Sequence, residues 1–178
     1  MTLVQSRVQF VALLLCVIAT GGARGAEPNR VYDANCALCH QKGGAGLRGQ
    51  FPRLAGRAAA IAATDTGLHY LTEVVLFGMM GKIEVDGVQI VGVMPSFAAL
   101  SDDDLASVLN YATHLDEWQA GWKRRPLVTA EDVRVTRAGQ QLSAAQVRAN
   151  RDSPILKSAL GPIGNDSSWP SGRRSQSH

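Results

Sequence analysis

Apolar residues recur at helical spacing in the middle of the chain. Between Gly67 and Gly78 the aliphatic positions fall three or four residues apart. They are Leu68, Leu71, Val75 and Leu76. This period predicts a helix with one buried face.

A second apolar stripe follows Ser101. Ser101 favours a helix N-cap, and the acidic run Asp102–Asp104 suits the positive end of a helix. The stripe consists of Leu105, Val108, Leu109, Ala112 and Leu115. The spacing predicts a third main helix that ends near Asp116 to Trp118.

The first main helix is expected over residues 28–41, with Tyr32 on the face that meets Val108 and Tyr111 of the last one. Residues 42–50 contain four glycines and predict a loop. Residues 82–93 alternate loosely around Asp86-Gly87, which is typical of a hairpin or of an extended loop with a tight turn.

The composition changes beyond Gly121. Residues 123–126 read as a linker, and Thr129 and Ser143 each favour the start of a short helix, the second in a capping box. Glycine, proline, serine and arginine dominate from Gly161 onwards, which predicts disorder. No tandem repeat is evident.

The amino-terminal stretch has the form of a secretory signal peptide. Arg7 precedes an apolar run over residues 8–19, and small residues follow it, with cleavage expected after Gly25 or Ala26. The run is short for a bilayer, which needs about 20 residues, so we expect membrane association only if this segment is retained. Cys16 follows three leucines rather than a small residue, which argues against a lipoprotein.

Charge is distributed unevenly around a total of +3. Residues 27–119 carry six basic and eleven acidic side chains, whereas residues 120–178 carry ten and four. The basic character therefore belongs to the tail. No recognition motif accompanies it, so nucleic acid is not an expected partner.

Candidate chemistry gathers at Cys36-Ala-Leu-Cys39-His40. This C-x-x-C-H spacing is the attachment signature of c-type haem. Positions i and i+3 lie on one helix face, so Cys36 and Cys39 can both add to haem vinyl groups. His40 then supplies an axial nitrogen to the iron. One covalent haem c per chain is the expected cofactor.

The motif has three alternative interpretations. A thioredoxin-like C-x-x-C needs a βαβ setting, which the pattern lacks. A structural zinc site needs four ligands, and beyond the motif only Cys16, His69, His114 and His178 are available, without a second paired spacing. A chance match to five residues is the third.

The second axial position has five candidates: Met79, Met80, Met94, His69 and His114. Met94 is favoured because it lies outside a predicted helix, on a loop stiffened by Pro95. Met80, in a glycine-flanked turn, is second. Histidine with methionine is the electron-transfer pair, in which the thioether raises the reduction potential.

Together these residues resemble the class I bacterial cytochromes c. Besides the haem motif, the shared elements are Pro52-Arg-Leu-Ala-Gly56 and Met94-Pro-Ser-Phe97, followed by a helix that bears Tyr111. The resemblance implies that the Pro52 carbonyl accepts a hydrogen bond from His40 and that Met94 is the sixth ligand. It also implies an all-α cytochrome c fold of three main helices around one haem, with redox proteins such as dehydrogenases, reductases or terminal oxidases as donor and acceptor.

The expected organisation is a signal peptide over residues 1–26, a cytochrome c domain over 27–119, a helical extension over 120–160 and a disordered tail over 161–178. The leading hypothesis is a periplasmic one-electron carrier rather than an enzyme. The alternatives are a non-catalytic cytochrome c subunit of a dehydrogenase or reductase complex, and a haem sensor or enzyme with an open iron site. Because the haem-bearing part is small for a self-sufficient core, the apo chain is expected to fold poorly.

Overall fold

The computed structural model describes residues 27–115 and 128–160. The segments that the sequence predicts as signal peptide, linker (residues 123–126) and disordered tail all lie outside the described residues. Among the residues that are described, no helix is long and apolar enough to cross a bilayer.

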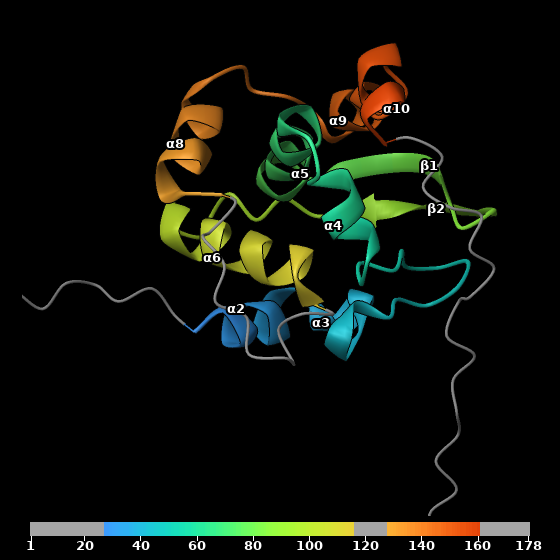
Figure 1. Ribbon diagram of the computed structural model, residues 1–178, viewed down its shortest axis with the longest axis horizontal. Coiled ribbons are helices and arrows are strands. Elements are labelled where there is room, and N and C mark those ends of the chain that lie inside the picture. Colours follow the sequence, from blue (N-terminus) through green and yellow to red (C-terminus); the bar gives the residue numbers. More distant parts are fainter. Residues whose placement is uncertain (1–26, 116–127, 161–178) are drawn as a thin grey trace, which may run out of the picture.

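The described helices form layers (Figure 1). Helices α2 (Pro28–Asn35) and α3 (Ala37–His40) lie at one end, with α6 (Asp102–Thr113) and α4 (Arg57–Ile61) above them. Helix α5 (Asp65–Phe77) follows, and α8 (Ala130–Ala138), α9 (Ala144–Asn150) and α10 (Pro154–Leu160) cover the far end. A short 3₁₀ turn, η1 (Lys42–Gly44), leaves α3.

The all-α prediction holds only in part, because residues 79–94 form a β-hairpin. Strands β1 (Met79–Val85) and β2 (Val88–Met94) pair antiparallel, from Met79 opposite Met94 to Val85 opposite Val88. The turn residues Asp86 and Gly87 both have positive φ, at 51° and 72°, as a two-residue type I′ turn requires. The strands begin three residues earlier and end one residue later than the alternation predicted.

The haem motif sits at a break in the first helix. The predicted helix over residues 28–41 divides at Cys36, whose backbone (φ −115°, ψ −36°) leaves ideal helical geometry, and α3 ends where Gln41 takes φ 63°. Helix α2 packs against α6, and the rings of Tyr32 and Tyr111 lie 5.1 Å apart. The predicted contact between the first and last main helices is thereby confirmed.

Helix boundaries follow local capping. The side-chain oxygens of Thr64 and Ser101 accept from backbone N–H groups and start α5 and α6. Helix α6 ends at Thr113, earlier than predicted, because His114 adopts a non-helical backbone. Capping boxes at Thr129 and Ser143 start α8 and α9, whereas α4 and α10 were not predicted.

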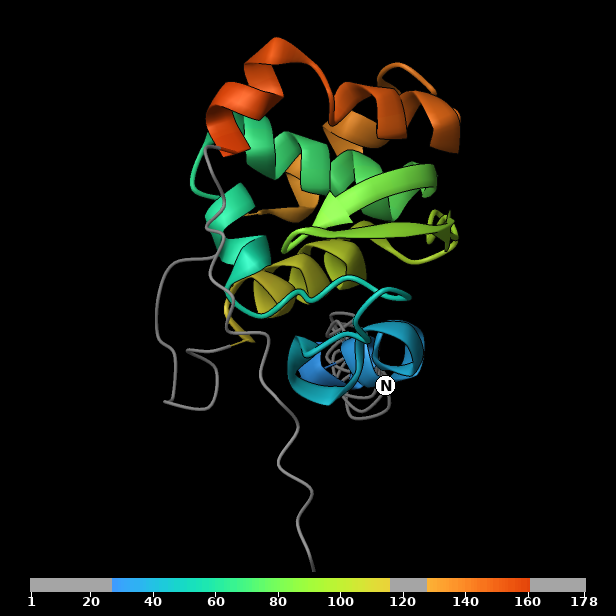
Figure 2. The same ribbon diagram turned by 90° about the vertical axis from the view of Figure 1, so that its right-hand side faces the viewer.

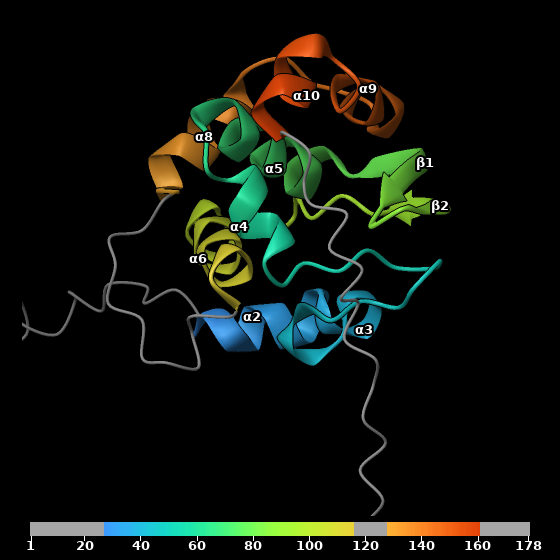
Figure 3. The same ribbon diagram turned by 45° about the vertical axis from the view of Figure 1, so that its right-hand side comes forward.

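The carboxy-terminal helices pack on the rest of the molecule. In Figure 3, α9 and α10 lie over α5, and α9 reaches the hairpin. The apolar faces of α8 and α9 contribute fully buried side chains to the core, Val133 from α8 and Val147 from α9. The extension is therefore part of the packed structure that surrounds the site.

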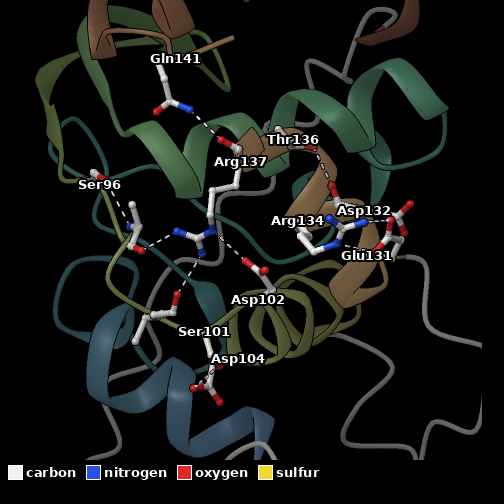
Figure 4. A network of polar contacts seen from close by, with 12 residues as sticks. Ser96, Ser101, Asp102, Asp104, Glu131, Asp132, Arg134, Thr136, Arg137 and Gln141 are labelled. Carbon is white, nitrogen blue, oxygen red and sulfur yellow. Dashed lines mark hydrogen bonds and ion pairs between the residues drawn. The ribbon is translucent and has the colours of Figure 1, made fainter. Parts of the chain in front are cut away.

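Arg137 links α8 to the start of α6 (Figure 4). Its Nε donates to Asp102 at 2.8 Å, and its two other nitrogens donate to the carbonyls of Ala98 and Leu100. The Arg137 side chain therefore donates hydrogen bonds to two carbonyl oxygens just before α6 and to one carboxylate in its first turn. The extension is thus fastened to the segment that follows Met94.

Candidate functional site

The motif side chains open onto two adjoining cavities of about 830 and 730 Å³, volumes that include some open solvent. Six residues line both cavities: Cys36, His40, Pro52, Met79, Ile83 and Met94. The walls come from α3, the hairpin, the end of α5 and α6. Figure 2 shows the hairpin running above the chain segment that follows the haem motif.

His40 is buried and oriented by the backbone. Its Nδ1 lies 2.8 Å from the carbonyl oxygen of Pro52, so Nδ1 carries the proton and donates. Nε2 is then the nitrogen with a free lone pair. Burial lowers the pKa of His40 below its ordinary value, and the Pro52 carbonyl opposes this shift. A neutral imidazole with a fixed tautomer is what metal ligation needs.

Gly46 lets the Pro52 segment approach. Its φ is +65°, and a Cβ there would lie 2.6–2.7 Å from the backbone around Pro52. Only glycine allows both this conformation and this approach. The glycine-rich loop after the motif therefore brings the Pro52 carbonyl to His40.

Cys36 and Cys39 are free thiols, one turn apart, and both line the second cavity. Burial, followed by the neighbouring Cys39, raises the pKa of Cys36 to about 11. Among the described residues, no cluster of three or more His, Cys, Asp or Glu side chains could hold a metal ion.

Met94 is the last residue of β2, not part of a loop as the sequence predicted. Its surroundings hold the backbone firmly: Gly78, at φ +74°, packs against the Met94 carbonyl. Just beyond, Ser96 Oγ donates to the Leu76 carbonyl, and Phe97 N donates to that of Val75. Met94 is thereby fixed to the end of α5.

The other candidates for the second axial position differ in placement. Met80 points out of the hairpin, is half exposed and lines neither cavity. His69 lies on α5, paired with Glu73 at 3.4 Å. The Nδ1 atom of His114 lies 2.8 Å from the Asn110 carbonyl, and neither histidine lines a cavity. Of the named alternatives, only Met79 shares the cavities with Met94.

Three arginines line the larger cavity: Arg53, Arg57 and Arg151. Arg53 Nε donates to Asp86 at 3.1 Å, and the Arg57 guanidinium lies 3.6 Å from the same carboxylate. Burial, followed by the charge of Arg151, lowers the pKa of Arg57 to about 10. Sequence reasoning missed the role of these arginines at the site. For Arg151, nothing in the basic tail indicated that the residue after α9 approaches the cavity.

The two adjoining cavities together fit a haem c. They offer two thiols for attachment, a neutral imidazole and a thioether for iron, and mostly apolar walls for the macrocycle. The excess of guanidinium groups over the single Asp86 carboxylate suits the two propionates that haem carries. The residues present are therefore sufficient to hold the group.

The comparisons with known proteins agree with this chemistry. Residues 23–111 match the family model of cytochrome c oxidase, cbb3-type, subunit III. A cytochrome c-552 of Thermus thermophilus is 44% identical over 146 residues, covering 82% of this chain and 95% of that protein. A cytochrome c6 of Leptolyngbya boryana is 34% identical over 101 residues, covering 56% of this chain and 100% of that protein.

A third relative belongs to a larger protein. The cytochrome c subunit of the quinone alcohol dehydrogenase of Gluconobacter oxydans is 33% identical over 128 residues, which cover 70% of this chain but 25% of that subunit. Together with the cytochromes above, these matches show that the chain belongs to the cytochrome c family, as a monohaem class I protein that carries electrons on a covalently bound haem c and is not an enzyme.

Proposed function

We propose that this protein is an exported one-electron carrier whose haem iron is held between His40 and Met94. The observation that carries the proposal is that both side chains line both cavities, together with Cys36, and that Cys39 lines the second. Cys36 and Cys39 provide the two thioether attachments, and the Pro52 carbonyl fixes the imidazole of His40.

When bound, haem supplies a metal that cycles between two oxidation states. His40 and Met94 would both hold the iron, which would leave no open site for oxygen or peroxide. Apolar lining residues such as Leu71, Val74 and Ile83 would keep water away from it. Histidine with methionine then gives a higher potential than two nitrogen ligands would.

Spectroscopy of the oxidised holoprotein tests this ligation. We expect the weak near-infrared sulfur-to-iron band in the wild type and in Met79→Leu, and no rapid binding of carbon monoxide by the reduced forms. Loss of the band in Met79→Leu would assign the thioether to Met79. Absence of the band in the wild type, with fast carbon monoxide binding, would favour the sensor or enzyme reading.

The domain organisation is proposed as the sequence predicts, with residues 1–26 removed on export. Only Cys36 and Cys39 then remain, which suits haem attachment outside the cytoplasm. Mass spectrometry of the mature holoprotein from a bacterial host tests this. A mass that includes residues 1–26 would contradict it and would point to a retained anchor.

The second candidate function is a non-catalytic cytochrome c subunit of a dehydrogenase or reductase complex. The similarity to a cytochrome subunit of a quinone alcohol dehydrogenase favours it. Deleting the whole extension is a poor test, because α8–α10 contribute to the core. A better variant changes Lys123, Arg124 and Arg125 to Glu and deletes residues 161–178. Co-purification with a large partner that this variant abolishes would support the subunit role.

A further inference from the structure

Met79 and Met94 are cross-strand neighbours at the open end of the hairpin. The strand register places them directly opposite each other, so their side chains lie on the same face of the sheet. Both are partly buried, both pack in the same apolar cluster, and both line both cavities. The cofactor site therefore contains two thioethers where axial ligation needs one.

The two sulfur atoms differ in their hydrogen bonding. The hydroxyl of Tyr70, a buried residue on α5, lies 3.3 Å from Met79 Sδ. Burial raises the pKa of this hydroxyl, and the nearby Arg151 opposes the shift. The hydroxyl donates its proton to the Met79 sulfur. In the part of the chain that the structure describes, no hydrogen bond engages the sulfur of Met94.

We propose that Met79 is a reserve axial ligand, which coordinates when Met94 is lost. The inference rests on the proposed His40–Met94 ligation. A thioether sulfur has two lone pairs, so the hydrogen bond from Tyr70 orients the Met79 side chain and leaves one pair available for coordination.

The backbone makes such an exchange feasible. Methionine is unbranched with three rotatable side-chain bonds, and Met79 begins on the same face of the ladder as Met94. Leucine nearly conserves the volume of methionine, so exchanges to leucine cost less than about 1.5 kcal/mol in packing. The ligand can therefore be varied without emptying the cavity.

Four oxidised holoproteins test the reserve role: wild type, Met79→Leu, Met94→Leu and the double variant. We expect the near-infrared band to persist in Met94→Leu at a shifted wavelength and to vanish only in the double variant. The reduced double variant should bind carbon monoxide rapidly, whereas Met94→Leu should not.

Failure of this inference is distinguishable from failure of the proposed function. If Met94→Leu loses the band while Met79→Leu keeps it, Met94 is the ligand and the reserve role is wrong. If Met79→Leu loses the band while Met94→Leu keeps it, the proposed His40–Met94 ligation itself is wrong. A band that survives in the double variant would overturn both.

Discussion

Single residues set the position of both proposed iron ligands. Gly46 allows the Pro52 carbonyl to reach His40, and Gly78 allows the Met94 segment to lie against the end of α5. The haem motif and Pro52 could be read from sequence because their spacing is local or belongs to a known pattern. Met79, Tyr70 and Arg151 could not, because their proximity depends on strand register and on the packing of α9.

Gly78→Ala should loosen the Met94 ligand. A Cβ would lie 2.6 Å from the Met94 carbonyl oxygen, at φ +74°. Gly87→Ala is the control for a positive φ without crowding, with φ +72° and no atom within 4 Å of the added Cβ. Its left-handed backbone alone should cost about 1–2 kcal/mol. Gly78 combines its positive φ with ψ −177°, a conformation that essentially only glycine adopts, and overpacking should add about 1–3 kcal/mol there, so Gly78→Ala should lose more. Denaturant unfolding and the near-infrared band would check this, and equal losses in the two variants would contradict it.

Tyr32 should make the holoprotein less stable at alkaline pH. Burial raises the pKa of this fully buried hydroxyl above its ordinary value of 10.0. The unfolded chain therefore loses the proton near pH 10 while the folded chain keeps it. The free energy of unfolding should fall as pH rises above 10, by up to about 1.4 kcal/mol per pH unit.

Unfolding in guanidinium chloride between pH 9 and 11 measures this slope. Tyr32→Phe should flatten it, at the cost of the hydrogen bond to the Gln41 carbonyl. Tyr111→Phe is the comparison, since this tyrosine is less buried, and it should change the slope less. A slope that is the same in all three proteins would contradict the assignment.

At the scale of elements, capping residues and the apolar period predicted most of the helices. These signals failed for elements whose structure depends on tertiary contacts. Ser101, Thr129 and Ser143 start helices as expected. Helix α4 follows Gly56 without a side-chain cap, and its five residues are too short for a periodic signal. The hairpin was ambiguous because only β1 alternates clearly between buried and exposed positions.

Arg137 should matter more for stability than Arg134, which lies on the same helix (Figure 4). Arg137 satisfies Asp102 and two carbonyls, so its replacement by alanine leaves partly buried acceptors unpaired. A loss of about 1–3 kcal/mol is expected. Arg134 pairs with Glu131 where both side chains are exposed to solvent, so Arg134→Ala should destabilise the protein less than Arg137→Ala. Thermal unfolding of the two holoproteins compares them, and a larger loss for Arg134→Ala would contradict the ranking.

At the scale of the whole molecule, polar and basic side chains of the extension contact the haem-bearing part of the chain. Arg137 pairs with Asp102, Asn150 donates to Glu73, and Arg148 and Arg151 donate to carbonyls of β1. The uneven charge of the sequence suggested a surface for partners. In the described residues, much of the basic charge of the extension serves the fold instead, which sequence counting could not reveal.

The haem should complete the folding of the chain. Cavities of this size, between α5, α6 and the hairpin, remove much of the core when the macrocycle is absent. Cys36→Ser/Cys39→Ser is expected to yield a chain with helical far-ultraviolet dichroism but little near-ultraviolet signal and poor amide dispersion. Cys39→Ser alone, which keeps one thioether, is the intermediate control. A well-dispersed spectrum of the haem-free variant would contradict the expectation.

Arg151 has a consequence for biogenesis. Arg151, just after α9, lines the larger cavity and donates to the Glu84 carbonyl of β1. Because a chain is made from its amino end, Cys36 and Cys39 are synthesised before this residue. We therefore expect attachment of the cofactor to begin before the last helices pack against the site.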